Sequence, residues 1–254
     1  MLMALTRDVS SSIQQCALTH LAREPIDLER ARAQHAAYEW ALVDAGCTVR
    51  RLGTSDALPD SVFIEDVAVV CDEVAIVTRP GAKARRAETT AVGEWLSRVR
   101  PVRVIEAPAT LDGGDVLIVG RQVFVGISAR TNENGAVQLR HLLAPHGYDI
   151  VAVPVDGCLH LKSAVTAVSE KALLINRSWT AAAAFEAFTL IEVDPGEPYA
   201  ANVLAVAGRV LYPASFPRTR QRLEEHGLDV RTLEVDELAR AEGALTCCSL
   251  IFNM

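Results

Sequence analysis

The chain repeats one arrangement of predicted elements at intervals of roughly fifty residues, which lies within the range of known repeat folds. In each repeat two apolar segments flank a short turn, as at residues 61–78, 111–128, 159–176 and 200–213. Each pair is followed by a segment with apolar residues at helical spacing and then by one short apolar segment. The sequence therefore predicts a strand–strand–helix–strand (ββαβ) unit that recurs along the chain.

The helix candidates place apolar residues three and four positions apart, and several of them end at a glycine. They are Asp27–Ala45, Lys83–Arg98, Asn132–His146, Thr180–Phe188 and Pro217–His226. The strands expected after them are Val49–Leu52, Val102–Glu106, Ile150–Val153, Leu190–Val193 and Val230–Val235. These five helices and five strands imply five units, although only four hairpins lie uninterrupted in the sequence.

The fifth hairpin requires both ends of the chain, because the run from Leu245 could pair with the N-terminal run Leu2–Arg7. A unit that cannot bury its own apolar faces must stack on its neighbours, and radial closure removes the open ends. We therefore predict one α/β domain over residues 1–254, a pseudo-fivefold propeller of ββαβ units. A doubly wound parallel sheet is the alternative, but it predicts single strands alternating with helices and fits the hairpins poorly.

In such a ring the first strands of the hairpins converge on the central axis. Each of these strands begins near polar or charged residues, which are costly inside an apolar strand unless they are paired or used. Their recurrence at the same place in successive units predicts one shared site. These residues are Asp60, Glu65 and Asp66; Asp112 and Asp115; His160 and Lys162; Asn202; and Thr246 with Cys247.

Two adjacent cysteines, Cys247 and Cys248, open the last apolar run. If this run is a strand throughout, neighbouring side chains point to opposite faces, so only one thiol faces a given pocket. A lone buried cysteine is usually inert. Here, however, His160 holds the equivalent position in another unit, and a cysteine and a histidine brought together by the fold form the usual nucleophile and acid/base pair. Cys247 is the candidate nucleophile.

The acidic residues at the axis favour a cationic ligand. Asp66 and Asp112 could face the axis together, and two carboxylates beside a thiol hinder its ionisation unless a cation lies between them. A guanidinium group fits because its planar fork matches carboxylates. Arg85 and Arg130 lie close to the expected helix starts at Lys83 and Asn132, where they could hold a carboxylate. Taken singly, these residues also fit ordinary turns and surface positions.

Composition narrows the functional classes further. A net charge of −7 argues against a nucleic-acid-binding protein and is compatible with a small cationic ligand. No apolar run reaches the roughly 18 residues of a membrane span, and the N-terminus lacks the features of a signal peptide. Six cysteines without CxxC spacing do not suggest a disulfide framework. We expect a cytoplasmic protein that binds neither nucleic acid nor membranes.

Seven segments, in order over almost the whole chain, carry a resemblance to a known family. They are Pro59–Asp66, Arg79–Ala82 with Arg85 and Arg86, Leu111–Val116, Arg130–Asn132, Leu159–Ser163, Ala200–Asn202 and Leu245–Ser249. Together they resemble the dimethylarginine dimethylaminohydrolases of the guanidine-modifying superfamily. That resemblance implies the fivefold ββαβ propeller known as the pentein fold.

The resemblance also implies a reaction, the hydrolysis of asymmetric dimethylarginine and monomethylarginine to citrulline and dimethylamine or methylamine, through a covalent cysteine thiouronium. By similarity, Cys247 is the nucleophile and His160 the general acid/base. The substrate would be a small molecule, with no metal and no cofactor, and the protein a monomer or homodimer. The resemblance also implies that Asp66 and Asp112 bind the guanidinium and that Arg85 and Arg130 bind the α-carboxylate. Asp60, together with the backbone near Leu18 and Ala241, would bind the α-amino group, and Glu65 would make a supporting contact.

Two alternatives stay open. A deiminase acting on arginine or agmatine belongs to the same superfamily, but arginine deiminases look longer and carry an acid two residues after the histidine, where this chain has Lys162. A non-catalytic methylarginine-binding protein would be favoured by loss of the cysteine, the histidine or an acid. All three are present here, so the sequence favours the hydrolase.

Overall fold

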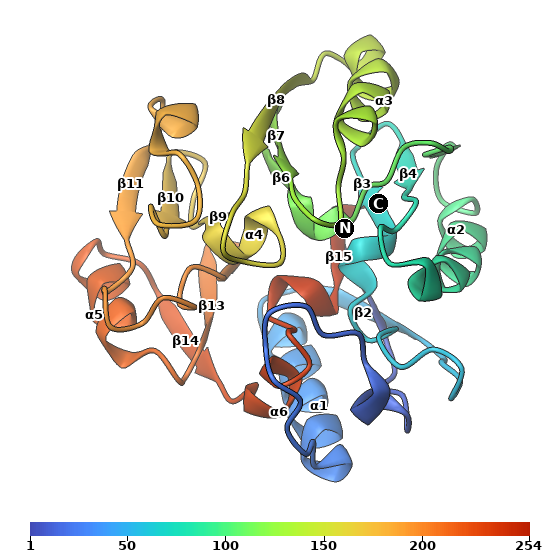
Figure 1. Cartoon of the computed structure of the whole chain (residues 1–254). Helices are drawn as coiled ribbons and strands as arrows, with labels where there is room; N and C mark the ends of the chain where they lie inside the picture. Colours follow the sequence, from blue (N-terminus) through green and yellow to red (C-terminus); the bar gives the residue numbers. More distant parts are fainter.

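The computed structural model describes residues 1–254 and contains five three-stranded sheets arranged around a centre (Figure 1). In every sheet the first two strands are antiparallel, and the third runs parallel to the second. The five sheets are β15 (Leu250–Asn253), β1 (Leu2–Arg7) and β2 (Thr48–Leu52); β3 (Ala68–Val70), β4 (Ala75–Val77) and β5 (Val102–Val104); β6 (Val116–Val119), β7 (Gln122–Ile127) and β8 (Asp149–Pro154); β9 (Val165–Ala167), β10 (Ala172–Ile175) and β11 (Thr189–Glu192); and β12 (Leu204–Val206), β13 (Arg209–Pro213) and β14 (Val230–Leu233).

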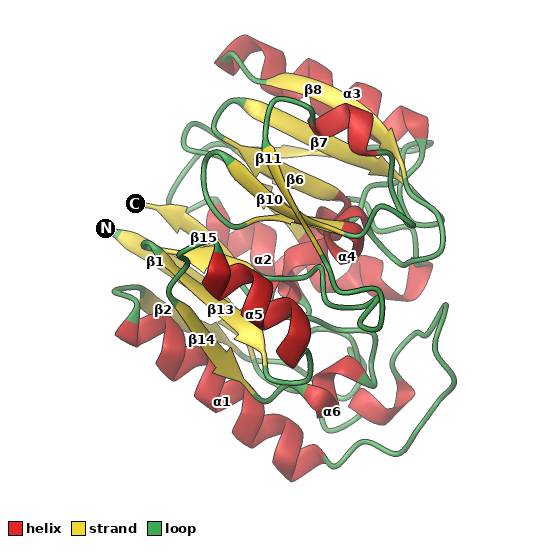
Figure 2. Cartoon of the chain, turned by 90° about the vertical axis from the view of Figure 1, so that its left-hand side faces the viewer, coloured by secondary structure: helices red, strands yellow, loops and turns green.

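The two ends of the chain close the ring. Strand β15 pairs antiparallel with β1, so that Leu5 lies opposite Leu250, and β1 continues the sheet in parallel with β2. The termini consequently lie side by side (Figure 2). The predicted pentein-type fold is therefore confirmed, including the hairpin shared by both termini, and the doubly wound sheet is wrong.

Longer helices join the second and third strands of four units and lie at the periphery of the ring in Figure 1. They are α1 (Leu28–Asp44), α2 (Thr89–Leu96), α3 (Glu133–Leu143) and α5 (Pro217–Glu225), with a short α6 (Asp236–Ala239) before the last unit. The helix expected over Thr180–Phe188 is wrong, because only a 3₁₀ turn forms there, at Ala182–Phe185. Thr180 is held in an isolated β-bridge with Val155, and Ala181, at the N-cap position, has no side chain that could accept a hydrogen bond from the first turn.

The inner ends of the hairpins also differ from the prediction. In four units a single helical turn, not a strand, precedes the first strand: η2 (Ile64–Val67), η4 (Gly113–Asp115), α4 (Leu161–Ala164) and η7 (Thr246–Cys248). The strand alternation expected at Cys247 and Cys248 is therefore wrong. Adjacent side chains still diverge, because successive residues of a 3₁₀ helix are rotated by about 120°.

The hydrophobic core is divided into clusters that join neighbouring units. In one of them Leu5 and Leu250, from the split unit, pack with Ile64 and Leu96 of the next unit. Burial of such side chains is the main favourable contribution to folding. None of the helices has the length and hydropathy needed to cross a membrane.

We expect Leu5→Ala to lower the free energy of unfolding by about 2–5 kcal/mol, because Leu5 is fully buried where the closing strand meets the next unit. Val104→Ala is the control, since Val104 is 54% exposed on β5 and its truncation should cost no more than about 0.5 kcal/mol. Urea unfolding followed by circular dichroism measures both. Equal effects of the two substitutions would contradict a closure that depends on Leu5.

Candidate active site

The helical turns at the inner ends of the units surround a small cavity. Segments from distant parts of the chain form its wall, so no short stretch of sequence could form it alone. Seven of the predicted site residues line it, and Leu18, Glu65 and Asp112 do not. The lining residues are Ala17, Asp60, Phe63, Asp66, Arg85, Arg130, Leu159, His160, Ala241, Glu242 and Cys247.

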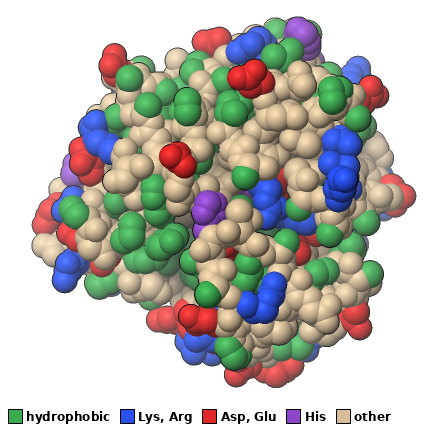
Figure 3. Space-filling view, viewed as in Figure 1, with side chains coloured by type: hydrophobic (Ala, Val, Ile, Leu, Met, Phe, Trp, Pro, Cys, Tyr) green, Lys and Arg blue, Asp and Glu red, His purple; other side chains and the backbone are tan.

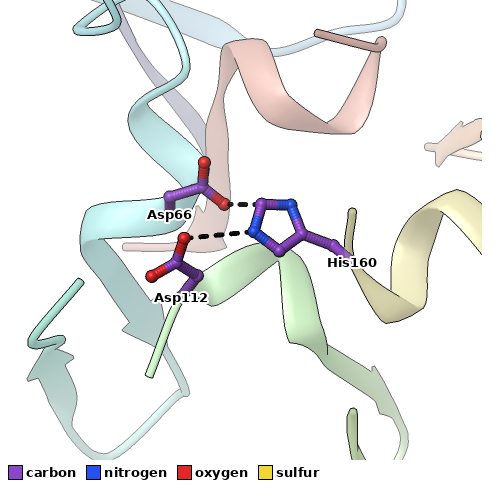
Figure 4. Close-up of side chains that lie close together, drawn as sticks. All are labelled: Asp66, Asp112 and His160. Carbon is purple, nitrogen blue, oxygen red and sulfur yellow. Dashed lines mark hydrogen bonds and ion pairs between the residues drawn. The ribbon is translucent and has the colours of Figure 1, made fainter. Parts of the chain in front are cut away.

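His160 immediately precedes α4, and the carboxylates of Asp66 and Asp112 face its ring side by side (Figure 4). Its Nε2 is 3.1 Å from Oδ2 of Asp112, and its Nδ1 is 3.8 Å from Oδ1 of Asp66. Burial alone would lower the pKa of this imidazole, but the charge of Asp66 and the hydrogen bond with Asp112 raise it to about 9. The ring is therefore an imidazolium at neutral pH.

Asp112 acts through the histidine and does not line the cavity. It is fully buried, its Oδ2 meets His160, and its Oδ1 accepts a hydrogen bond of 2.9 Å from the backbone N–H of Gly81. The direct contact with a guanidinium expected of Asp112 is therefore not supported by its position. With both oxygens engaged behind the ring, Asp112 is placed to orient His160.

Asp66 is the carboxylate that faces the cavity. It forms an ion pair with Arg85 and accepts a hydrogen bond of 3.0 Å from the backbone of Gly114. Burial would raise its pKa, but His160 and Arg85 lower it to about 2, so Asp66 is ionised. Gly114 is required here, because a Cβ atom would lie 2.7 Å from Oδ1 of Asp66 and 2.6 Å from the imidazole.

The two predicted carboxylate-binding arginines differ in their surroundings. Arg85 is held by Asp66, by Glu88 at 2.8 Å and by the carbonyl of Phe63 at 2.9 Å, so a ligand carboxylate would have to share it. Arg130 forms no ion pair, and its Nη2 donates to Oγ1 of Thr19 at 2.9 Å. Arg130 is therefore the more available anion site. Sequence reasoning missed Glu88, whose spacing of three residues from Arg85 was the available signal.

Cys247 lies on η7 and is 9% exposed. Burial, together with the charges of Glu65 and Asp66, raises the pKa of its thiol to about 12, so the thiol is neutral at rest. Cys248 is 1% exposed, points its Sγ toward the carbonyl of Ala244 at 3.5 Å, and lines no part of the cavity. This difference separates the two adjacent thiols in the way that the sequence predicts.

The N-terminal segment around Leu18 covers the cavity. Asp60 accepts hydrogen bonds of 3.0 and 3.2 Å from the backbone N–H of Ala17. Glu242 accepts hydrogen bonds from the backbone N–H groups of Thr19, His20 and Leu21. Leu18 itself is partly buried against the core and does not line the cavity, whereas Ala241 does. The segment is thus fastened over the site at Asp60 and Glu242.

A larger groove adjoins the cavity and shares Leu159 and Glu242 with it. Its free space is about 1310 Å³, and its wall includes Leu21, Tyr199 and Phe216. On the face seen in Figure 1, hydrophobic side chains gather left of the centre, beside a histidine (Figure 3). The wall of this groove also contains Cys158 and His20, but the thiol of Cys158 points to the carbonyl of His160 at 3.4 Å and forms no hydrogen bond with His20. The smaller cavity, where His160 is held by two carboxylates, is therefore the candidate active site.

Glu65 points away from the cavity, contrary to its predicted supporting contact with the ligand. Its carboxylate pairs with Lys162 and accepts a hydrogen bond of 2.9 Å from the hydroxyl of Thr246. It lines a separate hollow, together with Lys162 and Thr246. The reason is local, because η2 rotates Glu65 away from the side on which its neighbour Asp66 faces the cavity.

Asp66, Asp112 and His160 bring potential metal ligands within 4.8 Å of one another. Their charges are already balanced within the protein, since the imidazolium contacts both carboxylates and Arg85 pairs with Asp66. A metal ligand has to be a neutral imidazole, and the raised pKa of His160 opposes that form. The cluster is therefore better suited to holding a proton than a metal ion.

Comparison with known proteins places these features in a family. The family model described as N,N dimethylarginine dimethylhydrolase, eukaryotic, matches residues 8–184. The N(G),N(G)-dimethylarginine dimethylaminohydrolase of Streptomyces coelicolor is 40% identical over 97% of this chain and 95% of its own length. The Pseudomonas aeruginosa protein of the same name is 37% identical, over 92% of each chain.

Solved structures agree with this result. A cysteine-to-serine mutant of the Pseudomonas aeruginosa enzyme, complexed with citrulline, matches with a TM-score of 0.94 and 35% identity over 98% of each chain. The N-terminal domain of an arginine dihydrolase from cyanobacteria matches with a TM-score of 0.90 at 18% identity, which shows a shared fold alone. The chain therefore belongs to the dimethylarginine dimethylaminohydrolase family.

Proposed function

We propose that this protein hydrolyses Nω-methylated arginines, both asymmetric dimethylarginine and monomethylarginine, to citrulline and the corresponding amine. The observation that carries the proposal is that one cavity is lined by Cys247, His160 and Asp66 and also by Arg130, which forms no ion pair. A thiol, an acid and a carboxylate are what the displacement of an amine from a guanidinium carbon requires. The citrulline found in the relative's structure supports the same chemistry.

The charges in the cavity match a methylated arginine. Asp66 offers a carboxylate to the guanidinium. Arg130 offers a cation to the α-carboxylate, and Arg85, which is already paired with Asp66 and Glu88, contributes to that charge. Asp60 offers a second carboxylate for the α-amino group, with the covering segment and the backbone of Ala241 nearby. An amino acid with a cationic side chain would thus meet an opposite charge at each of its three ionic groups.

The reaction begins with a neutral thiol and an imidazolium. A bound guanidinium offsets the negative charges of Asp66 and Glu65, which lowers the pKa of Cys247. The thiol of Cys247 then loses its proton to solvent. The thiolate attacks the guanidinium carbon and forms the S–C bond. His160 gives its proton to the methylated nitrogen as the C–N bond breaks, and the amine departs.

Hydrolysis of the thiouronium completes the cycle. The neutral His160 takes a proton from water, and the resulting hydroxide adds to the carbon. The S–C bond then breaks as the new hydroxyl group loses its proton to solvent, which leaves citrulline, the thiolate and the imidazolium. Asp112 keeps the imidazole oriented in both steps and is a positioning residue. Glu88 has the same kind of role for Arg85. The remaining expectations, namely one domain, a cytoplasmic location, no cofactor, and a monomer or homodimer, stay predictions.

A deiminase acting on unmethylated arginine or agmatine is the second candidate. The position two residues after His160 argues against it, because Lys162 is paired with Glu65 outside the cavity and supplies no acid to a guanidinium. We expect citrulline to form faster from asymmetric dimethylarginine and monomethylarginine than from arginine, and we expect no turnover of agmatine, which lacks the carboxylate for Arg130. A colorimetric citrulline assay and amine analysis measure this. Faster turnover of arginine would refute the proposal.

The two thiols give a matched pair of variants. We expect Cys247→Ser to lower kcat by at least about 10³-fold, because a serine hydroxyl is a far weaker nucleophile than a thiolate at this site. Cys248→Ser should keep most of kcat and lose only stability, because Cys248 lies outside the cavity. Mass spectrometry of acid-quenched reactions should locate the substrate carbon on Cys247. An active Cys247→Ser variant would exclude the covalent route.

The charge of His160 predicts how stability depends on pH. Its pKa is raised from 6.5 to about 9 in the folded protein, so this stabilisation is complete below pH 6.5 and is lost as the pH rises through 9. Between pH 6 and pH 10, wild type should lose roughly 3 kcal/mol of unfolding free energy relative to His160→Gln. Urea unfolding at each pH measures the difference. A constant difference would mean that folding does not raise the pKa of His160.

A further inference from the structure

A closed circle of hydrogen bonds lies behind the active-site turns. Asn202 donates from Nδ2 to the carbonyl of Lys162 at 2.9 Å and to the hydroxyl of Thr246 at 3.0 Å. That hydroxyl donates to Oε2 of Glu65 at 2.9 Å, and Oε1 of Glu65 pairs with the ammonium of Lys162, which closes the circle. We call these four residues the axial ring.

Every hydrogen bond in the axial ring has one possible direction. The carbonyl of Lys162 can only accept, and the backbone N–H of Thr246, 3.2 Å from Oδ1 of Asn202, can only donate. These two contacts fix the side-chain amide of Asn202. Thr246 must then accept from Asn202 and donate to Glu65, so a change at any member leaves a buried partner unsatisfied.

Three ring members lie next to cavity residues along the chain. Glu65 precedes Asp66, Thr246 precedes Cys247, and Lys162 follows His160 by two residues. The helical turns point one residue of each pair at the axial ring and the other at the cavity. The ring therefore joins the turns of the nucleophile, the acid/base and the guanidinium carboxylate from behind.

Asn202 connects the two reacting turns most directly. It precedes β12 in the unit of residues 200–235, which supplies no side chain to the cavity, and it is 4% exposed. Its amide bonds to Thr246, beside Cys247, and to Lys162, beside His160. In the unit of β6, β7 and β8 the corresponding turn holds Gly113. A Cβ atom there would lie 2.0 Å from the carbonyl of Glu65, so no side chain fits at that position.

We propose that Asn202 is a positioning residue that holds the turn of Cys247 at a fixed place relative to the turn of His160. This inference rests on the proposed function, which makes those two residues the reacting pair. Catalysis by a positioned nucleophile and acid is sensitive to small displacements, and a shift of about 1 Å can cost 100-fold in rate. The unit without a cavity residue thus has a role in the reaction.

The test compares Asn202→Ala with Asn176→Ala. Asn176 is also a buried asparagine, and its side chain bonds to Pro198 at 2.8 Å and Ser178 at 2.9 Å but to neither reacting turn. With asymmetric dimethylarginine, Asn202→Ala should lower kcat by about 10- to 100-fold with little change in KM, because Asp60 and Arg130 are untouched. Asn176→Ala should keep the wild-type kcat.

A second measurement does not depend on turnover. All six cysteines are free and buried, so alkylation of the native protein by iodoacetamide, resolved by peptide mass spectrometry, reports local opening at each. Asn202→Ala should speed the alkylation of Cys247 and leave Cys71, which packs in a different core cluster, at the wild-type rate. An equal gain at both cysteines would mean general loosening, and unchanged kcat and alkylation in Asn202→Ala would equally overturn the proposal.

Thr246 supplies a conservative pair in case Asn202→Ala does not fold. Thr246→Val removes the hydroxyl and should reproduce the loss of kcat and the faster alkylation of Cys247. Thr246→Ser keeps the hydroxyl, so its kcat and its rate of Cys247 alkylation should both lie close to those of wild type. Equal behaviour of the two variants would overturn the proposal. If wild type forms no citrulline from methylarginines, the proposed function fails, while the alkylation pattern still decides whether the axial ring fixes Cys247.

Discussion

The antiparallel pairing of β15 with β1 is the constraint on which the rest of the molecule depends. It joins the two ends of the chain into one sheet and closes the ring of five units. The turn that carries Cys247 immediately precedes β15, so the register that fixes this strand also fixes the thiol. His160, by contrast, lies at the inner end of the unit of β9, β10 and β11. A nucleophile and an acid from distant parts of the sequence can meet only because radial closure brings the inner ends of all units to one axis.

The closed centre contains more charge than an apolar core tolerates, and the charges are arranged in pairs. Asp66 is shared by Arg85 and His160, and Asp112 supports His160 from behind. Glu88 completes the partners of Arg85, while Glu65 and Lys162 pair on the axis. Removing one member of such a pair leaves the other buried without compensation, which costs far more than the pair contributes. Asp60, Asp115 and Arg130, in contrast, form no ion pair. Asp60 and Asp115 accept hydrogen bonds from backbone N–H groups instead, whereas Arg130 donates to the hydroxyl of Thr19, which leaves its guanidinium available as an anion site.

Periodicity in the sequence predicts the units well, because each unit has to bury an apolar face against its neighbours. The split hairpin, four of the five helices and the gathering of Cys247, His160 and Asp66 all follow from that pattern. It does not predict the single helical turns at the axis, which are too short to leave a periodic signal. Nor does the pattern predict the local partners of Glu65 and Asp112, whose expected roles come from the family resemblance: Glu65 pairs with Lys162, and Asp112 hydrogen-bonds to His160. The roles of the cavity residues remain predictions until activity is measured.

The helical turns explain how one short segment serves two purposes. A strand entering the axis would present alternate residues to opposite faces and leave its backbone N–H groups to a neighbouring strand. A single turn instead frees backbone donors, and Gly114 and Leu161 use theirs on Asp66 and Asp115 at 3.0 and 2.8 Å. The same turns direct Glu65, Lys162 and Thr246 to a ring of fixed hydrogen bonds on the other side. Because rigid support and reactive groups share a turn, the resting thiol can remain neutral and buried, yet stay aligned for the arrival of a cationic substrate.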